Sequence, residues 1–129
     1  MKKVLVFGIF DGIHKGHREF FREAKAYGDY LIAVVAQDHI VEHLLGVPPN
    51  VNFADRFAHL ETIDEVDKVA IGEPIVSIAN LVTRYRADAV VFSADQELLR
   101  EDLERQRKNI PFAFTVHTVE SALDTRRPL

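Results

Sequence analysis

The sequence has no cysteine and no tryptophan, and it has no long apolar run. The missing cysteines exclude a disulfide scaffold, thiolate metal sites and cysteine catalysis. A membrane span needs roughly 18 consecutive apolar residues. The first apolar run stops at Gly8, which is too early even for a signal peptide. We therefore expect a cytoplasmic protein with no membrane segment.

An excess of positive charge is missing as well. The chain has 16 basic and 20 acidic side chains, a net charge of −4, which argues against a protein that binds nucleic acid or membrane surfaces through bulk charge. Apolar residues make up 47% and charged residues 28%, as in chains that bury a core. With 129 residues and neither a linker nor a repeat, we expect one domain, residues 1–129.

Short apolar runs alternate with helical patterns about five times. The runs read as strands at Val4–Phe7, Tyr30–Ala36, Lys68–Ile71, Ala89–Phe92 and Phe112–Val116. Helices are expected at 16–27, at 38–45, after a cap at Asn52 or Asp55, from Pro74 onward, and at 96–108 on Leu98, Leu99 and Leu103. This alternation predicts an α/β fold, a Rossmann-like doubly wound parallel sheet of five strands with helices on both faces. Ligands bind such sheets at the carboxyl ends of the strands.

The informative segment lies at that position, directly after the first strand. It runs from Gly8 to His17 and holds two histidines, His14 and His17, with Gly16 just before the second. A glycine lets the backbone approach a phosphate closely, and the amides that open a helix favour an anion. Two imidazoles at such a place can donate hydrogen bonds to phosphate oxygens as charge develops in a transition state.

Two simpler interpretations of this segment remain open. Two histidines three residues apart also occur in metal sites, but only Asp11 offers a further ligand nearby, so we expect no metal at the pair. Chance surface histidines are the other interpretation. The position after a buried strand and after a Gly-x-Phe-Asp sequence favours a functional site over chance. The glycines do not form a dinucleotide-binding G-x-G-x-x-G pattern, because they fall at positions 8, 12 and 16.

The segment Gly8–His17 resembles the signature of the H-x-G-H nucleotidyltransferases of the cytidylyltransferase-like family. The likeness continues through residues 20–34, through Arg56 and residues 66–69, and through residues 90–96. It is strongest to the glycerol-3-phosphate cytidylyltransferase type and to archaeal-type FAD synthetases. The resemblance implies a HUP-type nucleotidyltransferase fold.

The resemblance also implies a reaction. Members transfer a nucleotidyl group from CTP or ATP, accompanied by Mg²⁺, to a phosphorylated small molecule, and they release pyrophosphate. We expect CMP transfer to an acceptor like glycerol 3-phosphate. The alternatives are an FMN adenylyltransferase and a degenerate member that binds a nucleotide with little or no transfer. A flavodoxin-like signalling domain, which predicts no nucleotide binding, is a third possibility. Small members are often dimers, so a homodimer is expected.

The resemblance assigns roles residue by residue. Its catalytic residues are His14, His17 and Arg126, and Lys15, which lies next to the expected triphosphate site, is a further catalytic candidate. Its nucleotide-binding residues are Gly8, Ile9, Phe10, Gly16 and Thr125. Asp11, Asp95 and Arg56 match positions near the acceptor, and for Asp11 support of the loop is an alternative role.

Three departures from the family pattern motivate the degenerate alternative. Ile9 stands where a hydroxyl side chain is usual, and residues 37–52 contain no lysine or arginine, although members usually carry phosphate-binding lysines there. Asp124 places an acid where the family's second signature has a hydroxyl, and a carboxylate repels a polyphosphate.

Overall fold

The computed structural model describes residues 1–12, 15–72 and 77–120, with residues 15 and 16 described by their backbone alone. The strands are β1 (Lys3–Gly8), β2 (Tyr30–Val35), β3 (Lys68–Ile71), β4 (Ala89–Ser93) and β5 (Thr115–Val119). The helices are α1 (Lys15–Lys25), α2 (Asp38–Leu45), α3 (Phe53–Glu61), α4 (Ile78–Tyr85) and α5 (Glu97–Gln106). Short 3-10 turns flank α5 at Ala94–Gln96 and Arg107–Asn109.

All five strands are parallel, in the spatial order β3-β2-β1-β4-β5. The chain therefore winds outward from β1 to β3, crosses over, and winds outward again from β4 to β5. This is the doubly wound sheet that the sequence predicts, and its topological switch point lies between β1 and β4.

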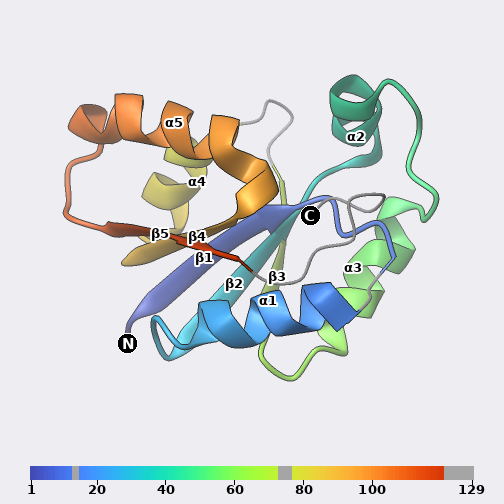
Figure 1. The fold of residues 1–129 in the computed structure, drawn as a ribbon, viewed down its shortest axis with the longest axis horizontal. Helices are drawn as coiled ribbons and strands as arrows, with labels where there is room; N and C mark the ends of the chain where they lie inside the picture. Colours follow the sequence, from blue (N-terminus) through green and yellow to red (C-terminus); the bar gives the residue numbers. More distant parts are fainter. Residues whose placement is uncertain (13–14, 73–76, 121–129) are drawn as a thin grey trace.

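The helices cover both faces of the sheet (Figure 1). Helices α4 and α5 pack on one face, α1 and α3 pack on the other, and α2 stands beyond the carboxyl end of β2. Side chains along β1 alternate between the faces: Leu5 and Phe7 join the cluster under α4 and α5, while Val4 and Val6 join the cluster under α1 and α3. Both faces are buried, which explains why the strands read as continuous apolar runs.

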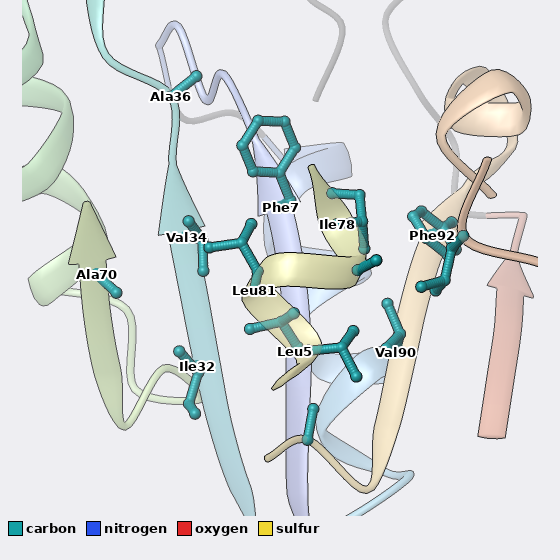
Figure 2. Close-up of a cluster of buried hydrophobic side chains, with 14 of the residues drawn as sticks. Leu5, Phe7, Ile32, Val34, Ala36, Ala70, Ile78, Leu81, Val90 and Phe92 are labelled. Carbon is teal, nitrogen blue, oxygen red and sulfur yellow. The ribbon is translucent and has the colours of Figure 1, made fainter. Parts of the chain in front are cut away.

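The cluster on the α4 side shows how the crossover helix closes the switch point. In Figure 2, Ile78 and Leu81 of α4 lie over Leu5, Val34 and Val90, which come from three neighbouring strands. Ser77 caps this helix and accepts a hydrogen bond from the amide of residue 80. The expected start of this helix at Pro74 lies outside the described residues.

Three expected elements have the bounds or the cap that the sequence indicates. The strand at 68–71 and the helix at 38–45 are found as predicted. Asn52 caps α3, because its side chain accepts a hydrogen bond from the Asp55 amide at 2.9 Å.

The last strand was predicted wrongly. It was expected at Phe112–Val116 and lies at Thr115–Val119. Phe112 and Phe114 gave the apolar pattern of a strand, but they pack against the core from the connection before β5. The strand itself is mixed in polarity because it forms an edge of the sheet. Leu98 was also misplaced: it is 80% exposed, and Leu103 fills the core position of α5.

Among the described residues, none of the helices has the length and apolar character that crossing a membrane requires.

Candidate functional site

The candidate site lies at the carboxyl ends of β1 and β4, beside the switch point. Gln96 joins the two strand ends: its Nε2 donates to the carbonyl of Phe7 at 2.6 Å, and its Oε1 accepts from the amide of Ser93 at 3.1 Å. Gln96 is buried. A neutral amide side chain thus satisfies one donor and one acceptor that the diverging strands leave unpaired.

The loop after β1 turns sharply at Phe10. This residue has a φ of 53°, in the left-handed region that side chains other than glycine seldom adopt. Its ring is completely buried, and the amide of Gly12 donates to its carbonyl at 3.0 Å. Such a conformation persists only when the surroundings hold it, and it is often found at functional sites.

His17 lies on the first turns of α1 and packs against that loop. Its ring and the Phe10 ring meet edge to face, with centroids 6.0 Å apart and planes at 80°. The His17 side chain has no solvent exposure in this conformation. His14 lies outside the described residues, so the convergence of the two imidazoles stays a prediction.

Asp11 holds the segment that leads into α3. One carboxylate oxygen accepts from the Asn50 amide at 2.8 Å, and the other accepts from the Val51 amide at 2.7 Å. The expectation for Asp11 named either the acceptor or support of the loop, and these two bonds give it a supporting contact.

Arg56 of α3 is completely buried and makes four hydrogen bonds. Its Nη1 donates to the carbonyls of Ile9 at 2.8 Å and Ala36 at 2.7 Å. Its Nε donates to the carbonyl of Val51 at 2.9 Å, and its Nη2 donates to Asp38 Oδ1 at 2.6 Å. The arginine therefore ties together the segments that follow β1, β2 and α2.

The other predicted residues are distributed around this edge. Gly8 ends β1, and the buried Ile9 follows it. Asp95 is exposed just after β4 and accepts a hydrogen bond from the Ser93 hydroxyl. Lys15 and Gly16 open α1. Thr125 and Arg126 lie outside the described residues, as does Asp124.

Sequence reasoning missed a pocket at the carboxyl ends of β2 and β3. It has a volume of about 440 Å³ and is lined by Gln37, Asp38, His39, Phe53 and Ile71. The Gln37 side chain donates to the carbonyl of Gly72 at 2.7 Å and so closes the gap between the two strand ends. Polar residues directly after the second apolar run, at positions 37–39, were the signal that pointed to this place.

Within the described ranges, no cluster of three or more histidine or acidic side chains has a geometry that would hold a metal ion. Two of the described residues, His117 and Asp67, have shifted pKa values, and both lie away from the β1 loop. The pKa of His117, on β5, is lowered by burial and by the nearby charges of Lys2 and Arg100. The pKa of Asp67 is lowered despite its partial burial, because Lys25 and the Leu31 amide both donate hydrogen bonds to it.

Comparison with known proteins adds to this geometry. The family model described as Cytidylyltransferase-like matches residues 5–127. An FAD synthase of Pyrococcus horikoshii is 41% identical over 108 residues, which are 84% of this chain and 73% of that protein. An FAD synthase of Thermococcus kodakarensis is 37% identical over 121 residues, covering 87% of this chain and 81% of that protein.

Two solved structures share the fold. A lipopolysaccharide core biosynthesis protein of Thermoplasma volcanium superposes with a TM-score of 0.86 at 24% identity, over 95% of this chain and 99% of that one. A pantoate-β-alanine ligase of Francisella tularensis superposes with a TM-score of 0.66 at 14% identity, over 99% of this chain and 62% of that one. The sheet order, the family match over nearly the whole chain and the related sequences agree: the chain is a nucleotidyltransferase and belongs to the cytidylyltransferase-like family.

Proposed function

We propose that the protein is an FMN adenylyltransferase, which makes FAD and pyrophosphate from ATP and FMN. The observation that carries this proposal is the similarity to proteins named FAD synthase, at 33% to 41% identity over most of both chains. The sequence alone favoured CTP and an acceptor like glycerol 3-phosphate. The relatives support the adenylyltransferase alternative better.

In this reaction a phosphate oxygen of FMN attacks the α-phosphorus of ATP in line. The new P–O bond forms as the bond to the β-phosphate oxygen breaks, and pyrophosphate leaves. The acceptor supplies its own nucleophile, so the protein contributes position and charge stabilisation. In this proposal His14 and His17 donate to the phosphate oxygens, which requires that the buried His17 ring becomes accessible when the substrates bind. Lys15 and Arg126 balance the negative charge of the leaving group.

The backbone around the β1 loop forms the nucleotide subsite of the proposal. Its members are Gly8, Ile9, Phe10, Gly16 and Thr125. The first turn of α1 begins directly after this loop, at the same edge, and the amino end of a helix favours an anion. Mg²⁺ enters with the triphosphate. The described residues form no resident metal cluster, and Mg²⁺ is commonly held by substrate phosphates with few protein ligands.

The pocket at the carboxyl ends of β2 and β3 is the proposed place of the flavin ring system. Its volume falls in the range of small-molecule sites, and Phe53 and Ile71 provide an apolar wall for a planar aromatic ring. Asp38 and His39 provide polar groups at its lining. Asp95 is exposed at the end of β4 and stays a proposed acceptor contact. For Asp11 and Arg56, direct contact with the acceptor also stays a prediction.

The main test measures pyrophosphate release by the purified protein with Mg²⁺. ATP plus FMN is compared with CTP plus glycerol 3-phosphate, and EDTA serves as the metal-removal control. We expect release and FAD formation with ATP and FMN, and a loss of at least about 100-fold in the His17→Gln variant. Turnover with only the CTP pair, or an unaffected His17→Gln variant, would contradict the proposal.

The pocket is tested with a matched pair of phenylalanines on one helix. Phe53 and Phe57, one turn apart on α3, both pack against the hydrophobic cluster under α1 and α3, but only Phe53 also lines the pocket. Phe53→Ala should raise the KM for FMN about tenfold and leave the KM for ATP nearly unchanged, since an aromatic contact to a ring is worth on the order of 1 kcal/mol. Phe57→Ala should affect stability rather than the KM for FMN.

A nucleotide-binding member without transfer is the second candidate. The segment 37–52, which carries no lysine or arginine, is the observation that favours it. Equilibrium binding of ATP and CTP separates the two: binding without pyrophosphate release on every acceptor supports the second candidate. The protein is also proposed to be a homodimer, and its molecular mass in solution tests this.

A further inference from the structure

Arg56 is the largest completely buried side chain among the described residues, and it carries a charge. Buried charges are costly unless they are paired and hydrogen-bonded. We propose that Arg56 is a positioning residue: it fixes the loop after β1 and, through Phe10, holds the His17 ring in place. The catalytic role of His17 in this inference rests on the proposed function. The placement of its ring by Arg56 and Phe10 does not.

The first step is the convergence of three loops on one guanidinium. The carbonyls of Ile9 and Ala36 belong to the segments after β1 and β2, and the carbonyl of Val51 belongs to the segment before α3. Each accepts a hydrogen bond of 2.7 to 2.9 Å. The planar fork of arginine presents five donors in fixed directions, so a single side chain sets the spacing of all three loops.

The second step is that Phe10 is anchored on both sides. Arg56 holds the carbonyl of the preceding Ile9, and the carboxylate of the following Asp11 holds the amides of residues 50 and 51. The peptide groups of Val51 are thus bonded to both anchors, through its amide by Asp11 and through its carbonyl by Arg56. These contacts supply the restraint that the left-handed conformation of Phe10 requires.

The third step leads from Phe10 to His17. The Phe10 ring lies 5.3 Å from the Phe21 ring and 6.0 Å from the His17 ring, all completely buried. A closely packed interior transmits displacement. When the anchors are lost, Phe10 can relax toward an ordinary backbone conformation, and its ring then no longer fixes the edge of the imidazole.

The Asp38 carboxylate links this arrangement to the pocket at the carboxyl ends of β2 and β3. It is paired with Arg56 at 2.6 Å, its side chain is 48% exposed, and it lines the pocket. The same arginine therefore touches the β1 loop on one side and a pocket wall on the other. Arg56 itself has no exposure, so its influence on an acceptor runs through two lining residues that it contacts, Asp38 and the Phe53 ring, whose centroid is 5.8 Å from its guanidinium carbon.

The test compares Arg56→Lys with two controls. Lysine keeps the charge but has one compact ammonium group, which cannot reach four acceptors in different directions. Arg105→Lys is the matched surface control, because that side chain is 68% exposed and forms an ion pair with Asp102 on the same helix. Leu103→Ala weakens the core on the opposite face, so it reports what lost stability alone does.

Two readouts are measured well below the unfolding temperature. The first is kcat and KM for ATP and for FMN. We expect Arg56→Lys to lose about 100-fold in kcat/KM for ATP, as a displacement near 1 Å at a reacting group can cause. The second is the ¹⁵N ring signals of His17 without substrate, assigned with His17→Gln. We expect them to shift in Arg56→Lys and to stay in place in Arg105→Lys and Leu103→Ala.

Unchanged His17 signals in a folded Arg56→Lys variant would overturn the inference, as would a kinetic loss no greater than that of Leu103→Ala. If Arg56→Lys does not fold, Asp11→Asn tests the same loop from the other anchor, because it leaves one acceptor oxygen in place of two. Its His17 signals should shift less but in the same sense, and unchanged signals would again overturn the inference. A wild-type protein that makes no FAD would instead contradict the proposed function, while the ring signals still decide the role of Arg56.

Discussion

The two ends of the parallel sheet leave opposite kinds of backbone group unpaired. Parallel strands leave unpaired amides near their amino ends and unpaired carbonyls near their carboxyl ends, and each buried group needs a partner. At the amino ends of this sheet the partners are aspartates near the surface. At the carboxyl ends they are long side-chain donors, two of the three buried. The two ends therefore differ in the charge and in the burial of the groups that complete them.

Three aspartates serve the amino ends. Asp29 accepts from the Lys2 amide at 2.6 Å, Asp88 accepts from the Lys3 amide at 2.9 Å, and Asp67 accepts from the Leu31 amide at 2.8 Å. A carboxylate has oxygens enough to accept from an amide and still contact water. These three are exposed residues, so their charges stay solvated and screened.

The carboxyl ends receive Arg56, Gln96 and Gln37. Their donors reach the carbonyls of residues 9 and 36, of Phe7, and of Gly72. Arg56 and Gln96 are buried, so their hydrogen bonds have little competition from water. Arg56 and Gln96 thereby fix the backbone at this edge, and phosphate chemistry depends on fixed position.

The largest effect should come from Arg56→Ala, compared with Asp88→Ala at the other end. The first change leaves the buried carbonyls of Ile9 and Ala36 without their donor, at about 1 to 3 kcal/mol each, and removes the partner of the half-exposed Asp38 carboxylate. The second removes one exposed acceptor and should cost about 1 kcal/mol or less. Urea unfolding measures both, and equal losses would remove the contrast between the ends.

Gln96→Glu sharpens the comparison at one position. A carboxylate can still accept from the Ser93 amide, but it faces the Phe7 carbonyl with no hydrogen to donate. At pH 7 we expect a loss of about 1 to 3 kcal/mol in the free energy of unfolding. Part of it should return as the pH falls and the carboxyl gains a proton. A variant as stable as the wild type at pH 7 would show that the Gln96 donor is dispensable.

Asp67→Asn should have a smaller, pH-dependent effect. The folded pKa of Asp67 lies below its ordinary value of 3.8, so the carboxylate contributes stability that is fully present above pH 3.8 and is lost as the pH falls through the folded pKa. The variant should be up to about 1 kcal/mol less stable at pH 7. The gap between wild type and variant should close in acid. A gap that widens below pH 3.8 would refute this sign.

His117→Gln should have the smallest effect, at the β5 edge. His117 stacks on Tyr27 with ring centroids 3.9 Å apart, and burial together with Lys2 and Arg100 lowers its pKa below 6.5. The fold prefers the neutral ring, so its stability contribution is full above pH 6.5 and falls as the pH drops through the lowered pKa. Thermal unfolding at pH 8 and pH 5 should show a smaller acid loss in the variant than in the wild type.

The sequence by itself determined the winding of the chain. Runs such as Tyr30–Val35 are apolar throughout because helices cover both sides of a parallel strand, and this pattern survives any detail of packing. It also placed the segment that begins at Gly8 directly after the first strand, at the edge where such sheets bind ligands. The sequence prediction failed at Phe112–Phe114. Apolar residues that pack against the core from a connecting segment have the same pattern as residues of a buried strand.

Only the tertiary structure decided what Arg56 and Gln96 do. Nothing in the local pattern distinguishes a buried arginine from a ligand-binding one, because its acceptors come from residues 9, 36 and 51, up to 47 positions away in the chain. The pocket at the carboxyl ends of β2 and β3 likewise brings together Asp38, Phe53 and Ile71 from three separate elements. Periodicity records which face of an element is buried, whereas a hydrogen-bond partner distant in sequence is fixed only when the strands come together.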